Sequence, residues 1–397
     1  RPKEGVPLGT EKLYEQDPYL RVFHAQVLSC EKAKQGWLIV LDRTAFYPEG
    51  GGQPGDQGVL DRVNVLDTHE KGETVVHLTD APIPAGTRVT GGSNWRLRHL
   101  HMQEHTGEHI LSGLLHRFYG ATNVGFHMGA ACVTLDVDRL LTPEQVAVCE
   151  RLANAAIWEN VPVEISYPDE ETLSHLAYRS KKALSGRVRI VTIPGYDVCA
   201  CCGTHVARTG EIGLLKVLNV MHYKGGVRIS IVCGRRALSD YTEKLGAVAR
   251  LSNTLSAKPE GVCAAVDHLL AEKEQADAEK AAAQERLFQL LAASVQPLGN
   301  GWAFVFEEGL SPDALRRLSL HLCERHACAA AFSGEPGQYA YALASQKLDL
   351  RPVSKAFNAA FSGRGGGKPN LVQGRVGAAS LDALRDWIAK QEQGETA

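Results

Sequence analysis

Long apolar runs, a signal peptide and an excess of positive charge are all missing from this sequence of 397 residues. No apolar run reaches the roughly 20 residues that a membrane-spanning helix needs, so we expect no contact with a membrane. Because no signal peptide is recognisable either, we expect a cytoplasmic protein. The net charge of -2 argues against a general nucleic-acid coat, although it permits local basic patches that attract a polyanion.

The pattern of a disulfide framework is missing as well. The ten cysteines are scattered, except that Cys199, Cys201 and Cys202 crowd together. Without a secretory signal, free or metal-bound thiols in a reducing compartment explain this distribution more simply. The chain is too long for one ordinary core, and its apolar and charged contents are typical of globular proteins, so we expect about two to four domains.

Two pairs of potential metal ligands are present, far apart in the sequence. His105 and His109 are four residues apart, and Cys201 and His205 repeat that spacing. The first pair lies in a predicted helix, whose apolar face is formed by Ile110, Leu111, Leu114, Leu115 and Phe118. One ion can contact two side chains at positions i and i+4 of a helix, and three nitrogens with one sulfur suit zinc. Either pair alone is common by chance, and four protein ligands could also hold a purely structural zinc ion.

A glycine-rich segment lies nearer the N-terminus, between Thr44 and Asp56. Its three consecutive glycines, residues 50–52, expose backbone N–H groups and allow a ligand to approach closely. It is not a P-loop, because no Gly-Lys-Ser/Thr follows. Thr44, Gln53 and Asp56 are polar residues suited to the lip of a binding site, while an ordinary glycine-rich loop is the alternative.

The distribution of strand and helix signals predicts an α+β protein with four parts. Residues 10–93 are expected to form a small β-barrel or sandwich, and residues 94–236 an α/β core that contains the ligand pairs. Residues 237–295 keep helical spacing and are expected to form a helical hairpin linker. Residues 296–397 alternate between strand and helix signals and are expected to form a C-terminal α/β domain.

Two basic segments are candidates for contacts with phosphate groups. Arg179, Lys181 and Lys182 begin a run of five positive charges without an acid, and Arg364 and Lys368 flank three glycines. Such runs are usually solvated surface, and a glycine-rich stretch is often a structural turn. Beside a nucleic-acid site, however, both are reasonable phosphate contacts.

Taken together, the motifs at residues 44–56, 105–109 and 201–206, in this order, resemble the editing domain of alanyl-tRNA synthetase in its free-standing AlaX form. The resemblance covers about residues 12–235. It implies a zinc ion held by all four ligand residues, and it implies that Thr44 and Gln53 lie near the misattached amino acid, with Thr44 contacting a serine hydroxyl. Cys202 departs from the family, which often has glycine there.

The C-terminal residues 361–374, with their Gly-Gly-Gly-Lys-Pro-Asn element, resemble a DHHA1 domain. This resemblance implies a role in tRNA binding or in a homodimer, which the helical hairpin could also form. The Asp-His-His signature of phosphoesterases that carry such domains is absent. The residues before Thr44 are too few for an aminoacylation domain, so we expect that this chain does not charge tRNA.

These observations favour a zinc-dependent hydrolase that deacylates tRNA(Ala) mischarged with serine or glycine. Glu108 is a candidate general base for that reaction. His105-Thr-Gly-Glu-His109 also fits the His-x-x-Glu-His pattern of inverzincin metalloproteases, in which the glutamate is the base. The third hypothesis is a zinc-stabilised RNA-binding module without catalysis.

Overall fold

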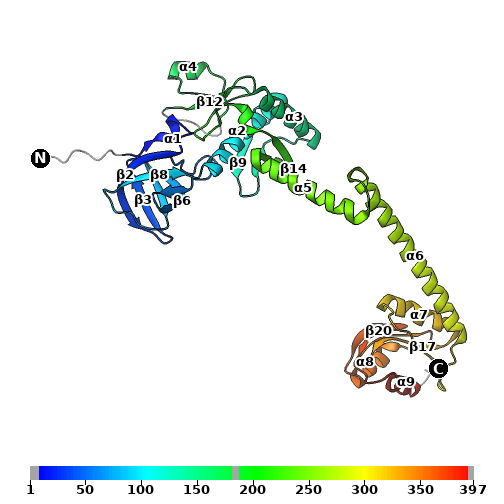
Figure 1. Cartoon of the computed structure of the whole chain (residues 1–397). Coiled ribbons are helices and arrows are strands. Elements are labelled where there is room, and N and C mark those ends of the chain that lie inside the picture. Colours follow the sequence, from blue (N-terminus) through cyan, green and yellow to red (C-terminus); the bar gives the residue numbers. More distant parts are fainter. Residues whose placement is uncertain (1–8, 181–186, 392–397) are drawn as a thin grey trace. The chain divides into compact units, whose positions relative to one another are not determined.

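The computed structural model describes residues 9–180 and 187–391, which divide into two compact units, Arg1–Arg250 and Leu251–Ala397 (Figure 1). We describe each unit by itself. Within the described ranges, no helix combines the length and the apolar character that crossing a membrane requires.

The first unit begins with a closed six-stranded barrel, in agreement with the barrel predicted for residues 10–93. Its strands, in their order around the barrel, are β2 (Val22–Lys32), β3 (Trp37–Leu41), β7 (Thr74–Thr79), β6 (Val63–Lys71), β5 (Gly58–Leu60) and β8 (Arg88–Ser93). Alternate side chains such as Phe23, Ile39 and Val65 fill the interior. The short strands β1 (Glu11–Lys12) and β4 (Arg43–Thr44) pair in parallel, and α1 (Leu13–Gln16) follows β1.

Helix α2 (Trp95–Tyr119) leaves the barrel directly after β8. Its N-cap is Asn94, whose side chain accepts a hydrogen bond from the Leu97 backbone N–H, and it ends at Gly120 in the left-handed conformation. The predicted apolar face is buried at residues 110, 111, 114 and 115. Phe118 is 52% exposed, so the prediction is wrong for that residue, which lies on the solvent side of the last turn.

Two antiparallel sheets and helix α3 (Pro143–Glu159) complete this unit. One sheet has the strand order β14 (Leu215–Tyr223), β15 (Gly226–Cys233), β10 (Val133–Val137), β9 (Asn123–Met128). The other consists of β11 (Glu164–Ser166), β12 (Ile190–Ile193) and β13 (Asp197–Ala200). The short helices are α4 (Glu170–His175) and η1 (Thr209–Ile212). Side chains from α2, α3 and the first sheet form one core.

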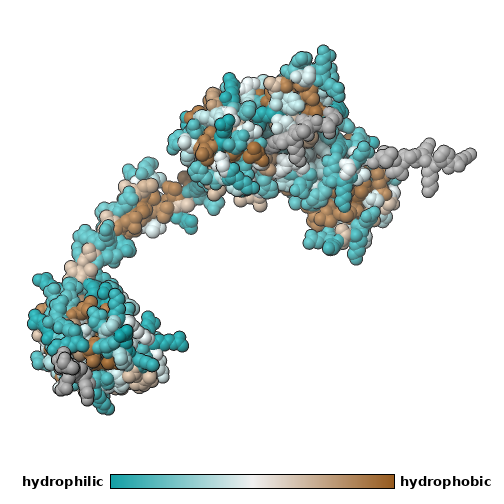
Figure 2. All heavy atoms as spheres, turned by 180° about the vertical axis from the view of Figure 1, so that it is seen from behind, coloured by the Kyte–Doolittle hydropathy of each residue, from teal (hydrophilic) through white to brown (hydrophobic). Residues whose placement is uncertain are grey.

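The predicted helices after residue 236 are α5 (Gly234–Leu255) and α6 (Val262–Ser294), with the turn η2 (Pro259–Gly261) between them. Several of their apolar side chains are exposed, as the brown spheres along this segment show (Figure 2). The most exposed are Leu238, Tyr241, Leu245 and Leu251 on α5, and Leu269, Leu270 and Leu290 on α6. The homodimer predicted through these helices stays a prediction.

The second unit contains a mixed five-stranded sheet, as its alternating signals predicted. The strand order is β16 (Trp302–Phe306), β17 (Cys328–Glu335), β18 (Gln338–Ser345), β20 (Leu371–Val376), β19 (Arg364–Lys368). Its helices are α7 (Pro312–Arg325), α8 (Leu350–Ala360) and α9 (Leu381–Ala389). Residues 364–368, whose three glycines are typical of a turn, instead form the edge strand β19, which makes a hairpin with β20. The four domain boundaries expected from the sequence stay predictions.

Candidate metal centre

The four predicted ligand residues come from two places in the first unit. His105 and His109 lie on consecutive turns of α2, and Cys201 and His205 lie in the loop that follows β13. The three histidines are almost fully buried and Cys201 is partly buried. The i, i+4 spacing therefore places both helical imidazoles on the side of α2 that faces the loop.

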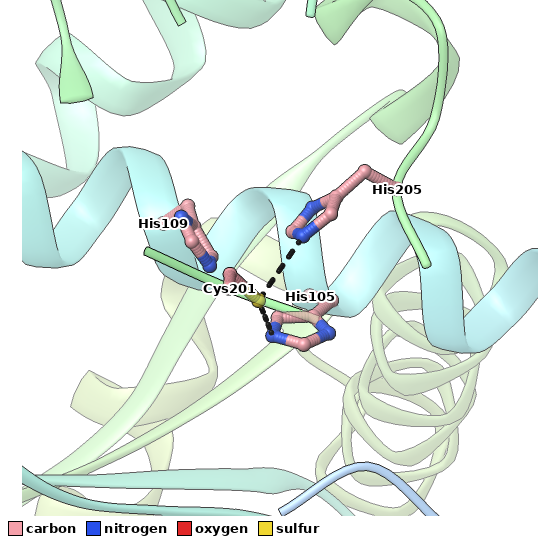
Figure 3. Close-up of side chains that lie close together, drawn as sticks. All are labelled: His105, His109, Cys201 and His205. Carbon is pink, nitrogen blue, oxygen red and sulfur yellow. Dashed lines mark hydrogen bonds between the residues drawn. The ribbon is translucent and has the colours of Figure 1, made fainter. Parts of the chain in front are cut away.

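The structure brings one ligand atom of each of these residues together, all within 4.8 Å of one another (Figure 3). Nε2 of His105 lies 3.4 Å from Sγ of Cys201, and Nε2 of His205 lies 3.5 Å from the same sulfur. The backbone N–H of Gly203 also points at this sulfur, at 3.3 Å. Such a group of three nitrogens and one sulfur could hold a metal ion.

Each of the three imidazoles also has a hydrogen-bond partner at its other ring nitrogen, Nδ1. Nδ1 of His105 lies 2.9 Å from Oε1 of Gln53, and Nδ1 of His109 lies 2.9 Å from Oδ2 of Asp197. Nδ1 of His205 lies 3.2 Å from Oγ1 of Thr106. Since the Thr106 hydroxyl already donates to a backbone carbonyl, it accepts here, as the other two oxygens do. All three rings thus carry a proton on Nδ1, and Nε2 is the nitrogen that faces the centre.

Gly203 is required for the close approach of the loop to α2. A Cβ atom at this position would lie 2.1 Å from Cε1 of His105 and 2.3 Å from its Nδ1. No side chain fits in that space, so glycine allows the His105 ring to lie directly against the loop.

The electrostatics of the centre favour a thiolate. Burial alone would raise the pKa of Cys201, but the positive charge of His105 and His109 outweighs it and holds the pKa well below its usual range. Burial would lower the pKa of His109, but the charge of Cys201 and the hydrogen bond to Asp197 raise it well above its usual value. Burial lowers the pKa of His205 to about 3.

Thr44 and Gln53, both predicted near the reacting amino acid, lie in different places. Gln53 is fully buried against the centre, where it also accepts from the Thr204 backbone N–H and donates to the Thr204 hydroxyl. Thr44 is also fully buried, but its hydroxyl lies 2.9 Å from Nε2 of His77. Since Nδ1 of His77 donates to a backbone carbonyl, Nε2 accepts the Thr44 proton. Thr44 thus helps to hold the barrel interior, and its contact with serine stays a prediction.

Glu108, the predicted base, is buried on α2 between the two histidine ligands. Its carboxylate accepts hydrogen bonds from Ser112 and from the side-chain amide of Asn123. Among the described residues, neither of the two groups that could hold a metal ion, the four ligand residues and the set of His109, Asp197 and Cys199, includes it. These contacts direct Oε1 toward β9, and its role as a base stays a prediction.

The predicted phosphate contacts have different surroundings. Both ends of the Arg179 guanidinium donate to Asp197, at 2.7 and 2.8 Å, so Arg179 supports the carboxylate that holds His109. Lys181 and Lys182 lie outside the described residues. Arg364 and Lys368 are exposed at the two ends of β19. The geometry tests none of the predicted tRNA contacts.

Sequence reasoning missed Asp197, Thr106 and His77. Asp197 lies directly before the cysteine cluster and Thr106 lies between the two histidine ligands, so nearness to the ligands was an available signal. His77 carried none, because a histidine in a strand does not reveal that it faces a threonine in the interior of a barrel.

Two regions of the sequence match known protein families. Residues 15–97 match the family model for class II (A) tRNA synthetases. Residues 188–230 match the model for the second additional domain of threonyl- and alanyl-tRNA synthetases.

Two curated relatives extend this similarity over most of the chain. The alanine–tRNA ligase of Pyrococcus abyssi is 32% identical over 389 residues, which are 92% of this chain and 42% of the ligase. The alanyl-tRNA editing protein AlaX-L of Pyrococcus horikoshii is 36% identical over 245 residues, which are 59% of this chain and 61% of that protein. This chain therefore spans less than half the length of the ligase it matches.

A solved structure, the C-Ala domain of Aquifex aeolicus alanyl-tRNA synthetase, matches 24% of this chain and 91% of that domain, with 19% identity and a TM-score of 0.21. That score is too low to support an argument about the fold. The sequence similarities define a protein related to alanyl-tRNA synthetases. More closely, the similarity to AlaX-L and the two family matches support an AlaX-type alanyl-tRNA editing protein, as the three motifs indicated.

Proposed function

We propose that this protein is a zinc-dependent hydrolase that removes serine, and also glycine, from mischarged tRNA(Ala). The observation that carries the proposal is the convergence of three Nε2 atoms and the Cys201 sulfur on one point. Its family includes an alanyl-tRNA editing protein, which supports the same reaction.

The residues of the centre fit a zinc ion. His105, His109, Cys201 and His205 would hold it, and Gln53, Asp197 and Thr106 already fix the three imidazoles in the required tautomer. The pKa of Cys201, which His105 and His109 hold below its usual range, favours the thiolate form that a zinc ion needs. When bound, zinc supplies a Lewis acid for the ester carbonyl or for the attacking water.

A second site that removes serine and glycine has a physical reason. A pocket sized for alanine rejects glycine only weakly, because a missing methyl group is worth about 1–3 kcal/mol. Serine adds only one hydroxyl to alanine. A separate hydrolytic site can recognise that hydroxyl by hydrogen bonding and leave alanine attached.

The contacts of Glu108 weigh against a metalloprotease. In the His-x-x-Glu-His mechanism, the glutamate must reach the water on the metal ion. Here Asn123 and Ser112 hold its Oε1, and two further ligands, Cys201 and His205, have no role in that mechanism.

A deacylation assay tests the proposal. We expect the full-length chain to release serine from Ser-tRNA(Ala) and glycine from Gly-tRNA(Ala), and to leave Ala-tRNA(Ala) intact. Cys201→Ala and removal of zinc by a chelator should each abolish the release. Cys202→Ser is the matched control, because Cys202 is the exposed neighbour outside the ligand group, and it should keep both zinc and activity.

Two other results would support the alternatives. Cleavage of peptides that is lost in Glu108→Gln would identify a protease. Retained tRNA affinity without release of any amino acid, in a protein loaded with one zinc ion, would identify a binding module.

A further inference from the structure

A cavity of about 500 Å³ lies beside Asp197, the residue that contacts Nδ1 of His109. The C-terminal part of α2, the turn between β12 and β13, and residues 177–179 line it, and it is open to solvent. Its polar and aromatic lining consists of His116, Arg117, Tyr178, Arg179, Tyr196 and Asp197. None of the four ligand residues lines it, so it is separate from the metal centre.

The cavity and the centre nevertheless share one carboxylate. Asp197 lines the cavity, accepts from Nδ1 of His109 at 2.9 Å, and receives both ends of the Arg179 guanidinium. A chain of hydrogen bonds therefore connects the cavity wall at Arg179 with a ring that faces the metal position. A ligand that contacts Arg179 therefore acts on a side chain bonded to Asp197, the residue that orients His109.

Gly113 keeps the cavity floor close to α2. A Cβ atom at this position would lie 2.3 Å from the backbone oxygen of Tyr196 and 2.9 Å from Cβ of Asp197. Only glycine allows the β12–β13 turn to approach the helix this closely, and this approach places Asp197 beside His109.

The lining has the chemistry of a nucleotide site. Tyr178 and Tyr196 are half-buried aromatic side chains that can stack against a base. Arg117 donates to the Gly195 carbonyl at 3.1 Å through one nitrogen, and its guanidinium and His116 can contact a phosphate. The negative charge of Asp197 is balanced by Arg179. The hydroxyl of Tyr196 donates a hydrogen bond to the Glu159 carboxylate at 2.6 Å.

We propose that this cavity binds a nucleotide near the 3′ end of the RNA that carries the ester, and that the Arg179–Asp197–His109 chain aligns the metal-binding ring when the nucleotide is bound. This inference rests on the proposed function. A volume of about 500 Å³ that is open to solvent is large enough to accept one nucleotide of a longer RNA.

Binding of the trinucleotide CCA to the zinc-loaded full-length protein tests the cavity directly. Isothermal titration calorimetry should show that Tyr178→Ala and Arg117→Ala each weaken binding about tenfold or more, since one stacked base or phosphate contact is worth about that factor. Arg151→Ala is the matched control, because Arg151 is exposed on α3 and does not line the cavity. It should bind CCA as the unchanged protein does.

Kinetics separate this inference from the proposed function. In deacylation, Arg117→Ala should raise the KM for Ser-tRNA(Ala) about tenfold and keep its zinc. Suppose that the unchanged protein releases serine, but that CCA does not bind or that Tyr178→Ala and Arg117→Ala behave like the unchanged protein. The cavity is then not a nucleotide site, and the proposed deacylase function stands. If AMP binds as tightly as CCA, the occupant is a free nucleotide and the proposal is overturned. If CCA binds at the cavity but no amino acid is released, the deacylase function fails.

Discussion

Oε1 of Gln53 lies 2.9 Å from Nδ1 of His105, although the two residues are 52 positions apart in the sequence. The same oxygen accepts from the backbone N–H of Thr204, in the loop that carries the other two ligands. One buried amide thus joins the glycine-rich segment, helix α2 and the cysteine loop. The metal centre is therefore an assembly of three segments rather than two ligand pairs that meet.

Replacing Gln53 with methionine tests this assembly. Methionine fills a similar volume but accepts no comparable hydrogen bond, so His105 loses its orienting partner. We expect zinc affinity to fall by about 10- to 100-fold, the usual cost of losing such a partner. Competition with a chromophoric chelator measures it. Gln57→Met is the control, because Gln57 is exposed, and an equal loss in both variants would contradict the role of Gln53.

Gly203→Ala should displace the same ring, His105, from the side of the cysteine loop. The new Cβ atom would meet Cε1 of His105 at 2.1 Å, so the ring must move. Because a displacement of about 1 Å can cost about 100-fold in rate, we expect incomplete zinc loading and a loss of deacylation of at least that size. Metal analysis and the serine-release assay measure the two effects.

The control for Gly203→Ala is Gly246→Ala. Nothing lies within 4 Å of a Cβ atom at Gly246, in the exposed helix α5. Alanine is favoured over glycine in a helix by about 1 kcal/mol, so this variant should be slightly more stable and fully loaded with zinc. Full zinc loading of Gly203→Ala as well would show that the loop tolerates the added methyl group.

Arg98→Met should destabilise the first unit. The guanidinium is 1% exposed, donates through Nε to Oδ2 of Asp56 at 2.7 Å, and donates to the backbone carbonyls of Pro18 and Ala45. Its removal leaves a buried, unpaired carboxylate, which costs about 3–5 kcal/mol. Chemical denaturation should show this loss.

Two further variants separate the lost charge from other effects of Arg98→Met. Arg96 lies two residues earlier on the same helix and is exposed, so Arg96→Met should change stability by less than about 0.5 kcal/mol. Adding Asp56→Asn to Arg98→Met should restore part of the stability, because the amide carries no charge to leave unpaired. No recovery in the double variant would mean that the two contacts with the Pro18 and Ala45 carbonyls, and not the charge, dominate.

The parts of the fold that the sequence predicted well have local causes. Thr142 followed by Pro143 is a typical helix start in the sequence, and α3 begins there with a capping box between Thr142 and Gln145. Ser311 followed by Pro312 has the same pattern, and α7 begins there. Residues 302–306 are apolar and aromatic between polar turns, which is typical of a strand, and they form β16.

The parts that the sequence did not predict depend on contacts between distant segments. No local pattern connects Gln53 with His105, or Asp197 with both His109 and Arg179. Residues 364–368 have little strand propensity because three of them are glycines, yet pairing with β20 makes them an edge strand. Both cases are tertiary contacts that override the local signal.

His77, in the interior of the barrel, should make the stability of the first unit depend on pH. His77 is fully buried, and burial lowers its pKa to about 4, whereas an unfolded histidine titrates near 6.5. Between these values the unfolded chain binds a proton that the folded barrel excludes. The neutral ring therefore contributes stability that is complete above about pH 6.5 and is lost as the pH falls to about 4, in total about 3 kcal/mol.

Urea titrations from about pH 7 to about pH 4 can measure this contribution, with barrel unfolding followed by hydrogen exchange of the β3 and β7 peptides. Other groups titrate in the same range, so the contribution of His77 is the difference between variants in the stability that is lost on acidification. His77→Gln should lose less stability on acidification than the unchanged protein, because glutamine binds no proton in either state. His24→Gln, at an exposed position, should keep the full loss. If His77→Gln and His24→Gln lose the same stability, the proton excluded by the barrel is not on His77.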